Sequence, residues 1–260
     1  MKPFTVIEYR KNGNIAEITL DRPEKRNAIN FDLSKELNRA LLQAKEDSAI
    51  KAVIITGAGK AFCAGIDLAF FRGMKPVDFR FFMETFYGEM TDIQRNLGKP
   101  TIAALNGPTL AAGCTIAFSC DMIIASEKAI IGYPEINVGL MPAMHLVLLP
   151  RIIGKLKAFE LCHIGEPINA EEALKLGMVN KVVPLEKLDE ASHEIAEKLA
   201  SKSPLLMKYC KDSFYRGMDM DFRKGIMDAI DILCVALSSE DSYEGLSAFV
   251  EKRKPTWKGR

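Results

Sequence analysis

The chain of 260 residues carries 35 lysines and arginines against 34 aspartates and glutamates, a formal net charge of +1. Its length is enough for one sizeable domain with its own core and an appended element. The near balance of charge gives no reason for attraction to a polyanion or to an acidic lipid surface. We therefore expect neither a nucleic acid nor a membrane as a partner.

The start of the sequence and its cysteines both favour a reducing, cytoplasmic setting. Charged residues interrupt the segment from Met1 to Glu8 before any apolar stretch reaches the length of a signal-peptide core. No uninterrupted apolar run approaches the ~18 residues of a membrane span. The cysteines form no Cys-x-x-Cys pair and no regular framework, which predicts buried, reduced thiols. They stand at positions 63, 114, 120, 162, 210 and 234.

The first part of the chain alternates strand and helix patterns. Short β-branched runs at 5–8 and 15–20 flank Asn12-Gly13 and predict a hairpin. Apolar residues at helical spacing predict an amphipathic helix over 31–46. The run 52–56, which glycines end, predicts a buried strand.

The same alternation returns after an aromatic-rich stretch, residues 70–86, which we interpret as a mobile helical flap. The expected order is then a strand at 101–105, a turn at 106–109, a helix at 111–118 and a strand at 122–125. Alternating strands and helices predict an α/β fold with a mostly parallel sheet covered by helices.

Beyond residue 185 the strand patterns stop. Helical patterns occupy 186–202, 205–216, 221–238 and 240–250. We predict an α/β core over residues 1–200, followed by a helical element over 201–260. That element is expected to pack on its own core or on a neighbouring subunit.

Several common site chemistries lack their sequence patterns. Gly57-Ala-Gly59-Lys60 follows a strand, but Phe62 takes the place of the third glycine of a dinucleotide loop. The three histidines, His145, His163 and His193, show no zinc-ligand spacing, and the Gly-x-Ser-x-Gly elbow of hydrolases is missing. We therefore expect no metal site and no bound cofactor.

Two glycine-rich turns each follow a strand, at residues 60–68 and 106–114. Small residues there let backbone amides approach a ligand closely. Amides at the start of the helix near residue 111 lack a helical partner and carry positive partial charge, so they can bind an oxyanion. Small residues after strands are also common packing devices, and both interpretations stay open at this point.

Seven short segments carry a family resemblance and occur in order along nearly the whole chain. They are Arg22–Asn30, Gly65-Ile66-Asp67, Lys99–Gly107, Cys120-Asp121, Pro134-Glu135, Gly177-Met178-Val179 and Glu251–Pro255. In these segments the chain resembles the crotonase superfamily of enoyl-CoA hydratases and isomerases. The resemblance implies a spiral of βαβ units and a C-terminal helical trimerisation element. It also implies homotrimers or hexamers that act on a coenzyme A thioester.

By the same resemblance, the oxyanion hole uses the backbone amides of Ile66 and Ala112, one from each glycine-rich turn. Two such amides would hold the thioester oxygen as it gains enolate charge, an interaction worth ~3–4 kcal/mol per donor. Many relatives have glycine where Ala112 stands. The added methyl narrows the site but leaves the amide in place.

The resemblance gives this chain one catalytic carboxylate, Glu135, where a typical hydratase has two. The other glutamate position falls at Thr115, which can hydrogen-bond a water but cannot act as a base near neutral pH. Apolar neighbours such as Ile131 and Ile136 predict a raised pKa for Glu135. Without the resemblance, a loop carboxylate paired with a lysine would explain Glu135 better.

The remaining site residues follow from the resemblance and from composition. Coenzyme A is expected to contact Lys25, Arg26, Ala28, Ala64, Asp67 and Leu68. An acyl pocket is expected from Phe70, Phe71, Met83 and Phe86, with His145 as a second polar group. The same aromatic residues would also suit a core, and His145 would suit a helix start.

Our leading hypothesis is an isomerase that moves the double bond of a 3-enoyl-CoA to position 2, with Glu135 as the single proton shuttle. The alternative is a hydratase of an enoyl-CoA or a cyclic dienoyl-CoA, in which Thr115 or His145 positions the water. Thioester hydrolysis and decarboxylation are further enzymatic alternatives. A non-catalytic acyl-CoA-binding subunit is the alternative of another class, and fold kinship alone does not separate them.

Overall fold

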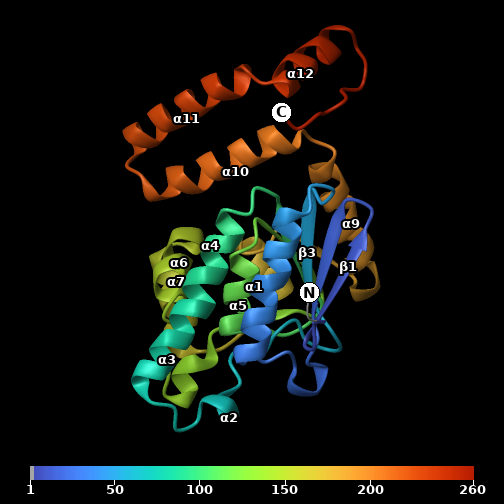
Figure 1. The fold of residues 1–260 in the computed structure, drawn as a ribbon. Coiled ribbons are helices and arrows are strands. Elements are labelled where there is room, and N and C mark those ends of the chain that lie inside the picture. The colour runs from blue at the N-terminus through green and yellow to red at the C-terminus, as the bar shows by residue number, and fades with distance from the viewer. Residues whose placement is uncertain (1–2) are drawn as a thin grey trace.

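A six-stranded sheet lies at the centre of the computed structural model, which describes residues 3–260 (Figure 1). The strand order is β1-β2-β3-β4-β6-β9, and every neighbouring pair except β1 and β2 is parallel. The strands are β1 (Ile7–Asn12), β2 (Ile15–Leu20), β3 (Ala52–Gly57), β4 (Thr101–Leu105), β6 (Met122–Ser126) and β9 (Lys181–Val183). The predicted α/β class and mostly parallel sheet are confirmed.

The hairpin of β1 and β2 differs slightly from its prediction. Its turn residues are Gly13, with φ +58°, and Asn14, so the turn lies one residue later than expected. The first strand begins at Ile7 because the amides of Thr5 and Val6 donate to the Glu36 carboxylate, at 2.8 and 2.9 Å to Oε2.

Helices cover both faces of the sheet. Helix α1 (Phe31–Glu46) begins as predicted, and its N-cap Asn30 accepts a hydrogen bond from the Leu33 amide at 2.9 Å. In β3, Val53 and Ile55 belong to the core cluster that contains α1, whereas Ala52 and Ile54 belong to the cluster that contains α9 (Leu188–Ala200). A strand buried on both faces needs a continuous apolar run, which is what residues 52–55 supply.

A second, three-stranded sheet was missed by the sequence analysis. It consists of β5 (Thr109–Leu110), β7 (Ile130–Gly132) and β8 (Ile168–Asn169), with β5 and β7 parallel. Strands of two or three residues show no periodicity that a sequence pattern can detect. This small sheet matters because β5 leads into the second glycine-rich turn and β7 leads toward Glu135.

The aromatic-rich flap is helical, as predicted. It consists of α2 (Leu68–Phe71), α3 (Pro76–Met83), a π-helical segment (Glu84–Glu89) and α4 (Met90–Arg95). Helix α5 (Ala112–Phe118) confirms the helix expected at 111–118. Three other helices were not assigned from the sequence: α6 (His145–Ile153), α7 (Lys155–Ile164) and α8 (Ala170–Lys175).

The C-terminal helices lie at one end of the molecule, with α10 between the core and α11 (Figure 1). They are α10 (Pro204–Asp219), α11 (Phe222–Leu237) and α12 (Glu240–Val250), close to the predicted ranges. The prediction that all six cysteines are buried is wrong for Cys210 and Cys234, which are exposed. They lie on α10 and α11, where the chain's own core does not cover the helices.

Within the described residues, no helix is long and apolar enough to cross a bilayer. Residues 3–260 also contain no group of three or more histidine, cysteine or acidic side chains arranged to hold a metal ion. The cytoplasmic location and the absence of a nucleic-acid partner stay predictions.

A buried ionic network joins α10 to the central sheet. Asp121 Oδ2 accepts hydrogen bonds from the Thr101 amide and from Lys211 Nζ, both at 2.6 Å, and Oδ1 accepts one from the Tyr215 hydroxyl at 2.7 Å. Lys211 is only 7% exposed and also donates to the Lys99 carbonyl. The ammonium group is therefore paired on two sides and holds the C-terminal element against the end of β4.

Replacing Lys211 by methionine leaves the Asp121 charge partly buried without its cation, and we expect a loss of about 3 kcal/mol in the free energy of unfolding. The control is Lys208→Met, one turn away, which removes a surface ion pair to Asp212 and should cost about 0.5 kcal/mol or less. Urea denaturation at matched protein concentration measures both. Equal losses in the two variants would contradict an anchoring role for Lys211.

Candidate active site

A cavity of about 190 Å³ lies where the helical flap meets the two glycine-rich turns and the loop that carries Glu135. Its lining residues are Ile66, Phe79, Met83, Tyr87, Ala111, Ala112, Glu135, Leu140, Met141 and Ala143. Of these, only Glu135 and Tyr87 have polar side chains. The cavity therefore combines an apolar wall with one carboxylate and one phenol.

The two glycine-rich turns are in direct contact at this cavity. Gly65 has φ +105°, and a Cβ placed on it would lie 3.0 Å from the Ala111 Cβ and 3.8 Å from the Ala112 nitrogen. A Cβ on Gly113 would lie 2.3 Å from the Cys63 carbonyl oxygen, well inside van der Waals contact. Both glycines are needed because a side chain at either position would push the turns apart.

The backbone at the start of α5 is strained in a way that exposes an amide. Ala111 has φ 52° and ψ −122°, a conformation that non-glycine residues rarely adopt. Its amide is held by the Gly132 carbonyl at 2.9 Å. Within residues 3–260, the amides of Ile66 and Ala112 donate to no backbone carbonyl, and both residues line the cavity. The amides expected to form the oxyanion hole are thus brought together and left unpaired.

Glu135 is held in a short 3₁₀ helix, Pro134–Val138, directly after β7 and Tyr133. It is 9% exposed, and its Oε2 atom has no hydrogen-bond partner in the described part of the chain. Burial raises the pKa of this carboxyl to about 7, against a small opposing effect of its own backbone amide. No cation contributes to that pKa. This environment argues against a loop carboxylate paired with a lysine.

Thr115 and His145 lie behind the cavity wall. Thr115 is fully buried on α5, and its hydroxyl is 3.1 Å from the Nε2 atom of His145, which is 1% exposed. The imidazole ring packs 4.5 Å from the Tyr133 ring, and burial lowers the pKa of His145 to about 3. This neutral histidine begins α6 and does not line the cavity, which differs from its expected place in the acyl pocket.

Tyr87 lines the cavity and was missed by the sequence analysis. It projects from the π-helical segment into the cavity. Burial raises the pKa of its phenol to about 12; the charge of Glu135 adds to the rise, and hydrogen bonding with the Thr115 side chain opposes it. The phenol is therefore protonated near neutral pH. The four-residue spacing of Phe79, Met83 and Tyr87 was the available signal, because it places them along one face of a helix.

The expected acyl pocket is only partly in place. Met83 lines the cavity, whereas Phe71 and Phe86 are buried in the core and Phe70 is 46% exposed. The ring centroid of Phe71 lies 4.4 Å from that of Phe82, and the Phe86 ring stacks on Phe82 at 6.0 Å. The three phenylalanines therefore belong to the aromatic contact between the flap and α1, and of the four predicted residues only Met83 reaches the cavity.

The residues expected to contact coenzyme A lie next to one another. An isolated bridge between Ile29 and Ile66 pairs the loop containing Lys25, Arg26 and Ala28 with the turn containing Ala64, Asp67 and Leu68. The Lys25 and Arg26 side chains are exposed. Asp67 has a structural contact, because it forms an ion pair with Arg22 at 3.1 Å and caps α2.

Comparison with known proteins identifies the family of this chain. The family model described as enoyl-CoA hydratase/isomerase matches residues 10–260. A probable mitochondrial enoyl-CoA hydratase of Dictyostelium discoideum is 38% identical over 98% of this chain and 92% of its own length. A short-chain-enoyl-CoA hydratase of Clostridium acetobutylicum is 37% identical over 94% of both chains.

A solved structure, that of an enoyl-CoA hydratase from Bacillus anthracis, superposes with a TM-score of 0.93 at 36% identity. The superposition covers 98% of this chain and 100% of the other. Sequence and structure thus agree over nearly the full length. The chain belongs to the enoyl-CoA hydratase/isomerase family and is an enzyme of the crotonase superfamily.

Proposed function

We propose that this enzyme isomerises a short-chain 3-enoyl-CoA to the 2-enoyl-CoA, with Glu135 as its single proton shuttle. The observation that carries the proposal is the lining of the cavity, where Glu135 is the one carboxylate and Thr115 lies behind the wall. A cavity of about 190 Å³ is smaller than the roughly 300–1,000 Å³ of sites for drug-sized ligands, which suits a short acyl group.

The reaction needs one base that works in both directions. The Glu135 carboxylate takes a proton from carbon 2, and the electron pair of that bond forms a dienolate whose charge resides on the thioester oxygen. The amides of Ile66 and Ala112 stabilise this oxygen. The protonated Glu135 then delivers the same proton to carbon 4, which leaves a double bond between carbons 2 and 3. A pKa near neutrality suits both steps.

Coenzyme A itself is part of the substrate, and the proposal requires no other cofactor. The exposed Lys25 and Arg26 would pair with its phosphates, and the turn of Ala64 and Asp67 would approach its pantetheine arm. Lys252 and Lys254, in the segment after α12, offer further positive charge at the C-terminal end.

A hydratase is the second candidate, because the Dictyostelium and Clostridium relatives are named as hydratases and because Tyr87 adds a hydroxyl to the cavity. In that reaction, Glu135 would take a proton from a water held by Tyr87. The water oxygen would bond to carbon 3 of a 2-enoyl-CoA, and Glu135 would return the proton to carbon 2.

Incubation with C4 to C6 3-enoyl-CoA and 2-enoyl-CoA in deuterated water separates the two reactions. We expect the 3-enoyl substrate to be converted to the 2-enoyl product with no gain of water, as read by mass spectrometry and proton NMR. Hydration of the 2-enoyl-CoA at a comparable or higher rate would overturn the isomerase in favour of the hydratase.

Glu135→Gln removes the base while preserving the size of the side chain, and we expect turnover to fall by about 10²–10⁴-fold. Glu166→Gln changes an exposed glutamate of the neighbouring loop and is the matched control, with turnover expected to be unchanged. Binding of butyryl-CoA should survive in both variants. Unchanged activity of Glu135→Gln on every thioester would instead favour the non-catalytic subunit.

The pH dependence follows from the carboxyl pKa of about 7. Only the deprotonated Glu135 can accept the carbon-2 proton, so kcat/KM should rise about tenfold per pH unit below that value and level off above it. The measurement is a pH profile of isomerisation from pH 5 to 9. A midpoint near the ordinary glutamate value would contradict the assignment of Glu135 as the base.

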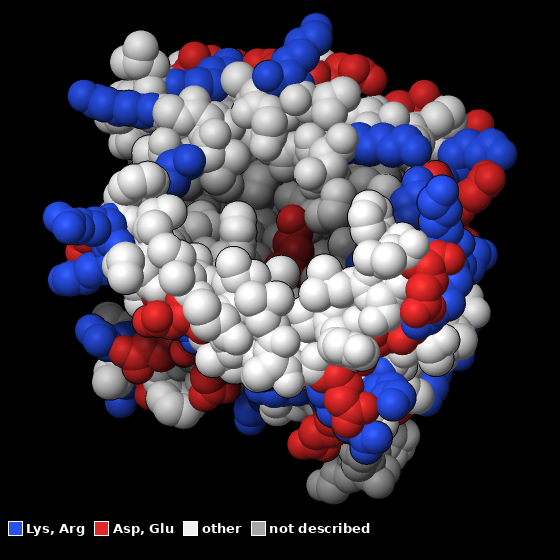
Figure 2. Space-filling view, turned by 90° about the horizontal axis from the view of Figure 1, so that it is seen from above, with Lys and Arg blue, Asp and Glu red and all other residues white. Residues whose placement is uncertain are grey.

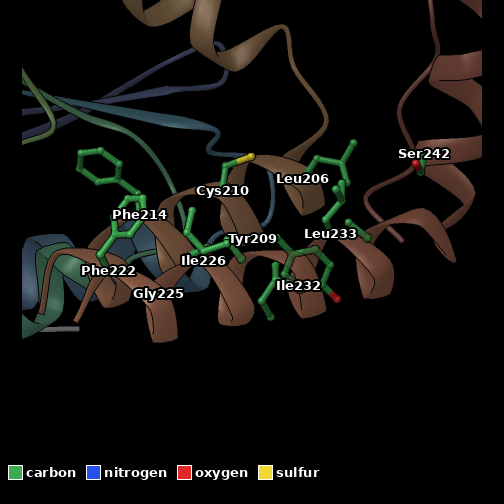
Figure 3. A pocket seen from close by; sticks show the side chains of 14 residues that line it. Leu206, Tyr209, Cys210, Phe214, Phe222, Gly225, Ile226, Ile232, Leu233 and Ser242 are labelled. Atoms are coloured by element: carbon green, nitrogen blue, oxygen red, sulfur yellow. The ribbon is translucent and has the colours of Figure 1, made fainter. Parts of the chain in front are cut away.

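We also propose that the C-terminal helices join copies of this chain into a homotrimer, or a hexamer of two trimers. A cavity of about 630 Å³ lies between α10 and α11, and no acidic or basic side chain lines it (Figure 3). Phe222, Ile226 and Leu233 of this cavity are largely exposed. Seen from the C-terminal end, uncharged side chains surround a central hollow with an acidic group at its floor, and many charged groups lie toward the margin (Figure 2).

Such an apolar surface is typical of an interface between subunits. We expect light scattering to give three or six times the mass of one chain, and Ile226→Asp to shift the population to monomers, because the interface would bury an unpaired charge. Lys224→Asp, two residues away on an exposed position, controls for the added charge. A monomeric mass for the unaltered protein would contradict the proposal.

A further inference from the structure

A second cavity, of about 410 Å³, adjoins the acyl cavity at Tyr87. Its lining residues are Tyr87, Gly88, Thr91, Asp92, Arg95, Met144, Val147, Leu148 and Arg151. Tyr87 is the one residue that lines both spaces. The residues just before α6 complete the wall between the two cavities. Ala143 lines the inner cavity, and the next residue, Met144, lines the outer one.

We propose that Tyr87 closes the distal end of the acyl cavity and thereby sets the upper limit on the length of the acyl chain. This inference rests on the proposal that the inner cavity holds the acyl group of a coenzyme A thioester. It does not depend on which reaction Glu135 catalyses, since the limit concerns the part of the chain beyond the reacting carbons.

The Tyr87 side chain has two neighbours behind it, Thr115 and Phe86. The Thr115 side chain is near enough to lower the pKa of the phenol, and the Thr115 hydroxyl lies 3.1 Å from Nε2 of the buried His145. The Tyr87 ring centroid lies 5.0 Å from that of Phe86, which is fully buried in the aromatic core. The packed Phe86 ring therefore supports the Tyr87 ring, which forms a wall between the two cavities.

The space beyond Tyr87 could hold more of an acyl chain. Met144, Val147 and Leu148 give the outer cavity an apolar side, whereas its other side is polar and includes Asp92, Arg95 and Arg151. Arg95 is engaged in an ion pair with Asp219 at 2.8 Å, so its charge is partly satisfied. A chain that passed Tyr87 would continue along the apolar side of this cavity, where each methylene that is fully buried is worth about fourfold in affinity.

Binding of saturated acyl-CoAs tests the inference without any reaction. Isothermal titration calorimetry would compare butyryl-, hexanoyl-, octanoyl- and decanoyl-CoA. For the unaltered protein we expect Kd to stop improving beyond hexanoyl-CoA. For Tyr87→Ala we expect a continued gain of roughly threefold or more for each added methylene up to decanoyl-CoA, because the two cavities become one.

Two further variants of Tyr87 serve as controls for the binding experiment. Tyr87→Phe keeps the ring and is expected to keep the short-chain limit, and Tyr87→Val provides a second opening should the alanine variant fold poorly. An unchanged chain-length profile in a folded Tyr87→Ala or Tyr87→Val overturns the inference while leaving the proposed function standing. So does decanoyl-CoA binding to the unaltered protein with the same gain per methylene. Failure of the unaltered protein to bind any acyl-CoA overturns both.

Discussion

The candidate active site depends on one constraint: two chain segments must meet beside the same small cavity with backbone amides left unpaired. An unpaired buried amide costs roughly 1–3 kcal/mol, and a strained residue such as Ala111 adds a similar amount. The fold supports this arrangement with the β5–β7 pairing, which holds Ala111 through the Gly132 carbonyl, and with Gly65 and Gly113, which let the turns touch. The same small sheet continues into the loop of Glu135. One structural unit therefore positions both the unpaired amides of the proposed oxyanion hole and the proposed base.

Burial keeps the ionisable side chains near those amides, other than Glu135, in their neutral forms. His145 is uncharged because it is buried, Tyr87 is protonated, and the cavity lining includes no lysine or arginine. Negative charge that develops on a ligand must then be stabilised by backbone dipoles, whose positions do not depend on pH. Glu135 is left as the group whose protonation changes near neutrality. A single titrating group in a fixed dipolar setting is suited to passing one proton back and forth.

Much of the fold could be predicted because its long elements have strong periodicity. The helix at 31–46 and the strand at 52–57 were found to within a residue, and so, approximately, were the C-terminal helices. The strands of the second sheet are too short to show a pattern. In the site, the sequence led to Glu135 and to the Ile66 and Ala112 amides, since their loops carry glycines and a family resemblance. It did not reveal which aromatic face of the flap turns inward, because that depends on packing against Phe31 and Phe82.

The π-helical segment at Glu84–Glu89 has a further consequence. A π-turn contains about one residue more than an α-turn, and each residue of an α-helix rotates the side-chain direction by about 100°. The segment therefore resets the facing of α3 relative to α4 while the helical rod stays continuous. Loss of a single residue here would rotate α3 relative to α4 by about 100° and change which flap side chains face the cavity. A one-residue gap at this place in an alignment would thus mark a relative with a differently lined cavity, even where the rest of its sequence matches.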